Sequence, residues 1–149
     1  MDTEKIAIIR VDNAAYFIED LFKQAFGDPP PQEPIHYVAF SHVGPATFEA
    51  IGYYHVYHHG EYALMGGLCV DPRYRNRGLG ERLVRVAFED AGEAKAFFAY
   101  SGIPVSMRIL RRVGYVDTRQ QYMMVKWLKP LSEEEKERMI TEAIALGPF

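Results

Sequence analysis

The chain has 149 residues, of which 48% are hydrophobic and 25% charged, enough for one domain with a sizeable apolar core. This composition excludes disorder, because disordered chains lack the apolar side chains that offset ordering entropy. The single cysteine, Cys69, excludes an internal disulfide and a multi-cysteine zinc site, and a net charge of −3 gives no bulk attraction for nucleic acid or an anionic membrane.

Hydrophobic spacing and turn residues predict alternating strands and helices along the chain. The predicted elements, in chain order, are a strand at 6–10, a helix capped by Asp12 or Asn13 that ends at Gly27, strands at 35–42, 48–57 and 61–70, a helix at 78–91, a strand at 95–100, a helix from Pro104 to Gly114, two short strands within 115–128, and a last helix that begins at Ser132. This order indicates a mixed α/β fold.

Two of these elements are particularly informative. The run 61–70 is almost wholly apolar, as expected of a central strand that is covered on both faces. The last helix opens with a capping box, Ser132 with Glu135, but its apolar stripe is narrow and its glutamates are many. We therefore expect one domain over residues 1–131 and a peripheral helix over 132–149, packed on that domain or on a second copy in a homodimer.

The segment from Val70 to Gly80 carries the clearest functional signal. It leads from a buried strand through a tight turn to a glycine-containing helix start, and five arginines face two acidic residues between positions 71 and 85. A helix start exposes unpaired N–H groups and the positive end of the helix dipole, and Gly78 and Gly80 let a phosphate approach. The alternative for such a segment is a solvated arginine-rich turn.

Two other phosphate-binding motifs do not fit this segment. A Walker A loop requires Gly-Lys-Ser or Gly-Lys-Thr, and neither occurs in the chain. The dinucleotide-binding fingerprint requires glycine or alanine at position 83, which is Leu83, together with a repeating βαβ pattern that is missing.

Arg75-Asn-Arg-Gly-Leu-Gly80, preceded by a strand that ends in Val70-Asp-Pro, resembles the acyl-CoA loop of the GNAT superfamily of acyl-CoA-dependent N-acyltransferases. The resemblance continues through the strand 95–100 and the helix that ends in Val113-Gly-Tyr115, so it covers about residues 60–127. It implies a mixed α/β fold with a mostly antiparallel central sheet that is splayed around a CoA site, with helices on both faces.

The resemblance also implies an acetyl-CoA site on this strand and loop. Pantetheine is expected to pair with the end of the strand, and the pyrophosphate with N–H groups of the loop. The residues implied for binding are Leu68, Cys69, Val70, Arg75, Asn76, Arg77, Gly78, Leu79 and Gly80. An amine would then attack the acetyl thioester directly near Gly66-Gly67, in a ternary complex.

The proton donor to the leaving thiolate is left open by the sequence. Many family members carry a tyrosine at the position of Leu110 and an asparagine at that of Ile103, and both are replaced here. Water, Ser101 or a tyrosine from elsewhere remain alternatives. Cys69 is a candidate nucleophile only by type, because a lone cysteine in an apolar strand is usually a small buried hydrophobe.

The proton acceptor is equally open. Glu61 is the one ionisable acid of the central strand, at its start, and Tyr53 and His55 share a face of the preceding strand. A histidine relay through His55 predicts a limb of the activity profile near pH 6 to 7, unless these residues only line a core. A metal site is disfavoured, because the adjacent His58 and His59 point apart on a strand.

The function that these observations predict is transfer of an acetyl group from acetyl-CoA to a small primary amine or amino-acid-like acceptor. The alternative is a non-catalytic acyl-CoA-binding module that acts as a sensor or partner switch. No apolar run approaches the roughly 20 residues of a membrane span, and the first residues do not resemble a signal peptide. We therefore expect a cytoplasmic enzyme with no nucleic-acid or membrane partner.

Overall fold

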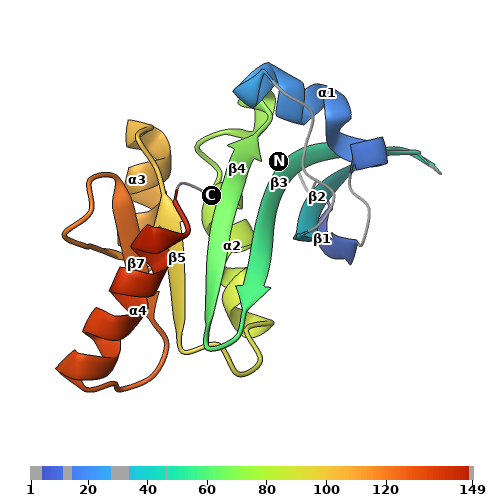
Figure 1. Cartoon of the computed structure of the whole chain (residues 1–149). Coiled ribbons are helices and arrows are strands. Elements are labelled where there is room, and N and C mark those ends of the chain that lie inside the picture. The colour runs from blue at the N-terminus through green and yellow to red at the C-terminus, as the bar shows by residue number, and fades with distance from the viewer. Residues whose placement is uncertain (1–4, 12–14, 28–33, 46, 148–149) are drawn as a thin grey trace. The chain divides into compact units, whose positions relative to one another are not determined.

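The computed structural model describes residues 5–11, 15–27, 34–45 and 47–147 (Figure 1). Its elements, in chain order, are β1 (Ile6–Val11), α1 (Ala15–Phe26), β2 (Ile35–Gly44), β3 (Thr47–His59), β4 (Tyr62–Val70), a 3-10 turn (Pro72–Tyr74), α2 (Leu79–Glu89), β5 (Ala96–Tyr100), α3 (Pro104–Arg112), β6 (Val116–Asp117), β7 (Met123–Trp127) and α4 (Glu133–Ala145). The predicted strands and helices are therefore present, and the 3-10 turn is an addition.

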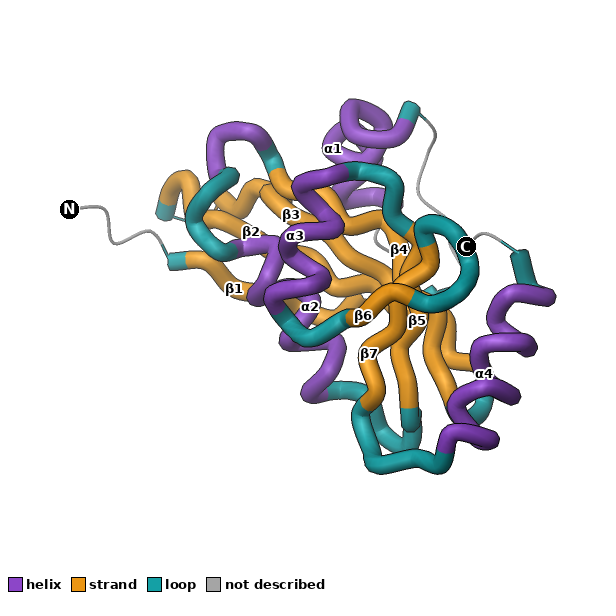
Figure 2. The backbone as a smooth tube through the Cα atoms, turned by 90° about the vertical axis from the view of Figure 1, so that its left-hand side faces the viewer, coloured by secondary structure: helices purple, strands orange, loops and turns teal. Residues whose placement is uncertain are grey.

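The strands form one sheet in the order β1-β2-β3-β4-β5-β7-β6. β1 pairs antiparallel with β2, and β7 pairs antiparallel with both β5 and β6, whereas β4 and β5 are parallel. Figure 2 shows β1 beside β2 along their length. The mixed α/β fold with a mostly antiparallel sheet is confirmed.

The contacts divide the chain into two units that interleave in sequence. The first comprises Met1–His55 and Gly67–Asp90, and the second Val56–Gly66 and Ala91–Phe149. Helix α4 belongs to the second unit. Whether residues 132–149 are dispensable stays a prediction.

In the first unit, helices cover opposite faces of β2 and β3. From α1, Ile18 and Phe22 pack with Val38 and Tyr53, and these side chains are at most 7% exposed. The neighbouring position on β3, Gly52, points to the other face, because side chains alternate along a strand.

Gly52 allows α2 to approach the sheet closely. A Cβ atom on Gly52 would lie 3.0 Å from Cδ1 of Leu83 and 3.4 Å from Cδ2 of Leu79, both buried on α2. It would also lie 3.4 Å from Cβ of Ala39 on β2. The absence of a side chain at this position therefore sets how near the start of α2 lies to the sheet.

In the second unit, α4 lies beside β7 (Figure 1), and the buried side chains of its narrow apolar stripe pack on the strands. Met139 and Ala143 are fully buried, in a cluster with Phe98 of β5 and Val125 of β7. The predicted capping box is confirmed, because the Ser132 hydroxyl accepts a hydrogen bond from the Glu135 N–H and the Glu135 carboxylate accepts one from the Ser132 N–H.

Two remaining expectations concern the helix ends and membranes. Asp12 and Asn13, the candidate caps of α1, lie outside the described residues, whereas Gly27 ends α1 as predicted, in a left-handed conformation with φ +83°. Within the ranges given above, the helices are too short or too polar to span a membrane.

Candidate functional site

The candidate site begins where β4 ends, and its turn is shaped by Asp71. The carboxylate of Asp71 accepts a hydrogen bond of 2.9 Å from the backbone N–H of Arg73 and so caps the 3-10 turn that follows β4. The chain then reaches Gly78, which precedes α2 in a left-handed conformation with φ +78°. Glycine adopts this conformation without the steric cost that a side chain imposes.

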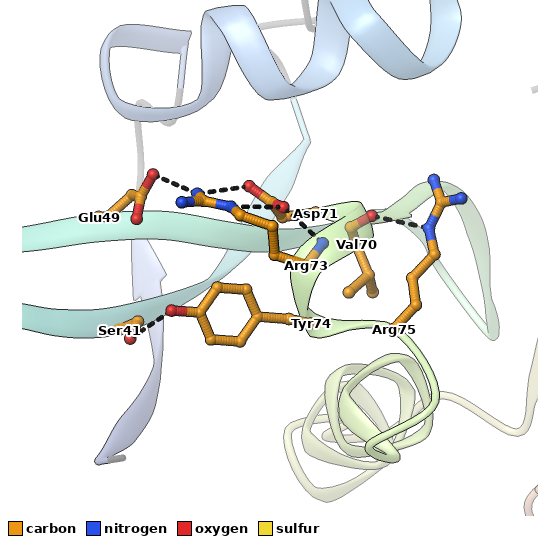
Figure 3. A network of polar contacts seen from close by, with 7 residues as sticks. All are labelled: Ser41, Glu49, Val70, Asp71, Arg73, Tyr74 and Arg75. Carbon is orange, nitrogen blue, oxygen red and sulfur yellow. Dashed lines mark hydrogen bonds and ion pairs between the residues drawn. The ribbon is translucent and has the colours of Figure 1, made fainter. Parts of the chain in front are cut away.

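The turn is fastened to β3 and β2 by two neighbouring residues (Figure 3). Arg73 donates a hydrogen bond of 2.5 Å to Glu49 and binds both carboxylate oxygens of Asp71, at 3.1 and 2.9 Å. These hydrogen bonds and the guanidinium charge lower the pKa of Asp71. The buried Tyr74 donates a hydrogen bond of 3.1 Å to the Ser41 hydroxyl. Of the five arginines between positions 71 and 85, Arg73 thus stabilises the turn.

Four of the residues expected to contact phosphate, Arg75 to Gly78, follow this turn and are exposed. The Arg75 side chain extends away from Arg73, and its Nε donates a hydrogen bond of 3.2 Å to the Val70 carbonyl (Figure 3). The Arg77 guanidinium lies 5.2 Å from the centre of the Tyr74 ring. Arg75 and Arg77 therefore lie on a turn whose conformation is fixed by the hydrogen bonds of Arg73 and Tyr74.

The start of α2 fits a phosphorylated ligand. Gly78 supplies no side-chain cap for the first N–H groups of the helix, and a Cβ atom there would meet nothing within 4 Å. Uncapped N–H groups at a helix start, next to Arg75 and Arg77, form an anion-binding arrangement. Leu79 and Gly80, the first two residues of α2, are buried.

The strand residues before the turn are half-buried or buried. Leu68 and Val70 are partly exposed, whereas Cys69 is 7% exposed. Burial raises the pKa of the Cys69 thiol to about 12, although the nearby Arg75 charge opposes this. A thiol with this pKa is not ionised at neutral pH, which favours a packing role for Cys69. Residues Tyr62–Met65 of β4 pair with β5, whereas β4 itself continues beyond this paired stretch to Val70.

Next to this end of β4, the structure brings together three polar rings. Nδ1 of His36 lies 2.6 Å from the Tyr53 hydroxyl, and Nδ1 of His55 lies 3.1 Å from the same hydroxyl. Burial, assisted by the neighbouring His36, lowers the pKa of His55 to about 3. His55 is thus neutral at physiological pH, and a titration near pH 6 to 7 is not expected from it. His36 was not singled out from the sequence, because its partner is 17 positions away on another strand.

The His55 ring lies directly against Gly67 of β4. A Cβ atom on Gly67 would lie 2.7 Å from both Cε1 and Nδ1 of His55, and 3.0 Å from the Phe22 ring of α1. Gly67 also has φ +68°, which side chains rarely adopt. The close ring and the left-handed backbone thus account for a glycine at position 67 of this strand.

The other candidate acid and base lie in the second unit. Glu61 forms ion pairs with Lys95 at 2.9 Å and Arg138 at 2.8 Å, and hydrogen bonds from these two residues lower its pKa. These contacts favour a structural role for Glu61. The Ser101 hydroxyl lies 3.4 Å from both the N–H and the carbonyl of Ile103, at the start of α3.

Leu110, at the position of the family tyrosine, is 3% exposed. Ser101 also lines an open pocket of about 360 Å³ together with Tyr100, Gly102 and Tyr122. Leu110 has no proton to donate, and lining a pocket does not by itself make Ser101 a donor. The proton donor therefore stays unassigned among the described residues.

The buried strand is followed by an arginine-bearing turn and by a helix start without a side-chain cap, an arrangement that favours binding of a phosphorylated ligand. The sequence model of the Acetyltransferase (GNAT) family matches residues 11–115. The chain belongs to this family, and its predicted recognition as a GNAT protein is confirmed.

Curated relatives match part of the chain. A mycothiol acetyltransferase of Rhodococcus opacus is 32% identical over 92 residues, which are 61% of this chain and 29% of the relative. A mycothiol acetyltransferase of Segniliparus rotundus is 41% identical over 66 residues, which are 43% of this chain and 25% of the relative. The chain thus spans less than a third of the length of these relatives.

Solved structures share the fold at low identity. Arabidopsis thaliana NAA60 in complex with a bisubstrate analogue has a TM-score of 0.67 and 13% identity, covering 83% of this chain and 98% of that one. The ribosomal-protein-S18-alanine N-acetyltransferase of Escherichia coli has a TM-score of 0.63 and 11% identity, covering 87% and 97%. These neighbours support the GNAT fold.

Proposed function

We propose that the chain is an N-acetyltransferase that moves an acetyl group from acetyl-CoA to a primary amine by direct attack in a ternary complex. The observation that carries this proposal is the uncapped start of α2 beside Arg75 and Arg77, on a turn held in place by Arg73. Acetyl-CoA supplies an acetyl group activated as a thioester, and the amine nitrogen replaces the sulfur.

The residues proposed to bind acetyl-CoA divide by role. Backbone groups of Leu68 to Val70 would pair with pantetheine, and N–H groups from Asn76 to Gly80 would bind the pyrophosphate, with Arg75 and Arg77 adding charge. A backbone N–H near Leu68 would stabilise the oxyanion. His55, which is neutral and lies against Gly67, would accept a hydrogen bond from the amine or from a water molecule.

The binding half of the proposal is tested by calorimetry with acetyl-CoA. Gly80→Val should weaken binding strongly, because a side chain blocks the approach of the pyrophosphate, and Arg75→Ala should cost about 1–2 kcal/mol, because exposed charges are screened while the backbone donors remain. Arg85→Ala, exposed on the same helix, is the matched control. Unchanged affinity in a folded Gly80→Val variant contradicts the assignment.

The catalytic half is tested by thiol release from acetyl-CoA with a panel of amines. The panel includes small amines, amino acids and, because of the relatives' names, the acceptor of a mycothiol acetyltransferase. A steady release that depends on one amine supports the enzyme. Acetyl-CoA binding without release supports the second candidate, a non-catalytic acyl-CoA-binding module, which is favoured by the buried Leu110 in place of the family tyrosine.

A further inference from the structure

Two buried imidazoles share one phenol hydroxyl in the first unit. His36 on β2 and Tyr53 on β3 are fully buried, and His55 on β3 is 5% exposed. Their contacts run from Nδ1 of His36 through the Tyr53 hydroxyl to Nδ1 of His55. The His55 ring in turn packs against Gly67, beside the strand segment proposed to hold the thioester.

The two distances indicate which group donates in each contact. A phenol has a single hydrogen, so Tyr53 can donate to only one of the two nitrogens. Hydrogen bonds from a hydroxyl to an oxygen are typically about 2.7–2.8 Å long, shorter than the roughly 2.9–3.0 Å that is typical from an N–H to an oxygen, and we take the same order for a hydroxyl that donates to a ring nitrogen. The 2.6 Å contact therefore fits donation from Tyr53 to His36, and the 3.1 Å contact fits donation from Nδ1–H of His55 to the Tyr53 oxygen.

This direction of donation fixes the proton on His55. A neutral imidazole has one protonated nitrogen and one nitrogen with a lone pair. If Nδ1 of His55 carries the hydrogen, Nε2 carries the lone pair and can accept a hydrogen bond. The lowered pKa of His55 keeps the ring neutral, so the position of this one proton determines what the ring can do.

We propose that His36 is a positioning residue for acetyl transfer: through the Tyr53 hydroxyl it holds His55 in the Nδ1–H form, with the Nε2 lone pair ready to accept a hydrogen bond from the acceptor amine or its water. This inference rests on the proposed function. His36 touches neither substrate, and its effect passes through Tyr53 and His55.

The phenol that links the two histidines packs among apolar side chains. Tyr53 belongs to an apolar cluster with Phe22 of α1 and Cys69 of β4, and the Phe22 ring centre lies 5.4 Å from that of Tyr53 and 6.5 Å from that of His55. Burial raises the pKa of Cys69 to about 12, so this member of the cluster is not ionised at neutral pH. An apolar surrounding strengthens the hydrogen bonds that set the proton positions.

The first test measures the protonated nitrogen of His55 directly by ¹⁵N NMR of the folded chain at pH 7. We expect Nδ1–H in the wild type and in His36→Asn, whose side-chain oxygen can accept from Tyr53. In His36→Leu, His55 is the one histidine of the pair that can still accept a hydrogen bond from Tyr53. Its Nδ1 should then be the acceptor, so the ring proton should move to Nε2. An Nε2–H form in the wild type, or no change in His36→Leu, overturns the proposal.

The second test measures kcat with the best amine. We expect His36→Leu to lose about tenfold or more in kcat with little change in KM for acetyl-CoA, and His36→Asn to restore it. His42→Leu, exposed on the same strand, is the control. If His36→Leu does not fold, Tyr53→Phe serves instead and should lose both the Nδ1–H preference and kcat; a Tyr53→Phe enzyme that retains both contradicts the proposal.

Failure of the proposed function gives a different result. If the wild type releases no thiol with any amine, the N-acetyltransferase assignment fails, and the role of His36 in catalysis fails with it. The NMR comparison of wild type, His36→Leu and His36→Asn still decides whether His36 sets the proton position on His55. If thiol is released but neither kcat nor the NMR signature responds to His36→Leu, only the role of His36 is refuted.

Discussion

Replacing His55 with glutamine should change how the stability of the fold depends on pH. His55 is 5% exposed, and burial lowers its pKa from an ordinary value of 6.5 to about 3. Above pH 6.5 the ring is neutral in both the folded and the unfolded chain. As the pH falls toward 3, the unfolded chain binds a proton that the folded chain does not, so the free energy of unfolding decreases.

The magnitude follows from the two pKa values. The decrease approaches about 1.4 kcal/mol per pH unit below pH 6, because one proton is bound on unfolding. Between pH 7 and pH 5 the contribution of His55 alone amounts to about 2 kcal/mol. Aspartates and glutamates titrate in the wild type and in the variant alike, so the difference between the two proteins isolates His55.

The assay is urea unfolding of wild type, His55→Gln and His42→Gln at pH 7, 6 and 5. We expect His55→Gln to be less stable than the wild type at pH 7, because it loses ring packing, and this gap should shrink by about 2 kcal/mol at pH 5. The exposed His42→Gln should follow the wild type at each pH. A gap between wild type and His55→Gln that stays constant from pH 7 to pH 5 refutes the reasoning, since it means that the folded ring titrates normally.

Three further outcomes are expected. Met139→Ala should lower the free energy of unfolding by about 2–5 kcal/mol in urea titration, because Met139 is fully buried in the second unit; a loss below 1 kcal/mol would contradict this estimate and support the peripheral role expected for α4. Gly67→Ala should destabilise the fold more than Gly60→Ala, since both glycines have φ near +65° but only Gly67 faces the His55 ring; equal losses on thermal unfolding would contradict this contact. Cys69 should react with a thiol reagent at pH 8 far more slowly in the folded chain than in urea, because its pKa is about 12; rapid labelling of the folded chain is the opposing result.

Much of the fold follows from local patterns in the sequence. The capping box of Ser132 and Glu135, the stop at Gly27 and the apolar run of β4 each depend on residues close together in the chain, and each has the expected structure. The arginine and glycine spacing from Arg75 to Gly80 predicted the acyl-CoA loop of the GNAT family, and the family is confirmed. The 3-10 turn escaped prediction, because three residues carry no periodicity.

The roles of individual side chains depended on contacts between distant residues. In the sequence, Arg73 adds to the positive charge of the loop. In the structure it binds Asp71 and also Glu49, which lies 24 positions away on β3. The sequence likewise places His55 and Tyr53 on one strand face, but not His36 beside them on β2. Residue type and spacing along the chain thus determined the helices and strands and pointed to the family. Only tertiary burial, which removes water from the His55 ring, decided its pKa and its neutral state, because desolvation is set by the neighbours that surround a group in space.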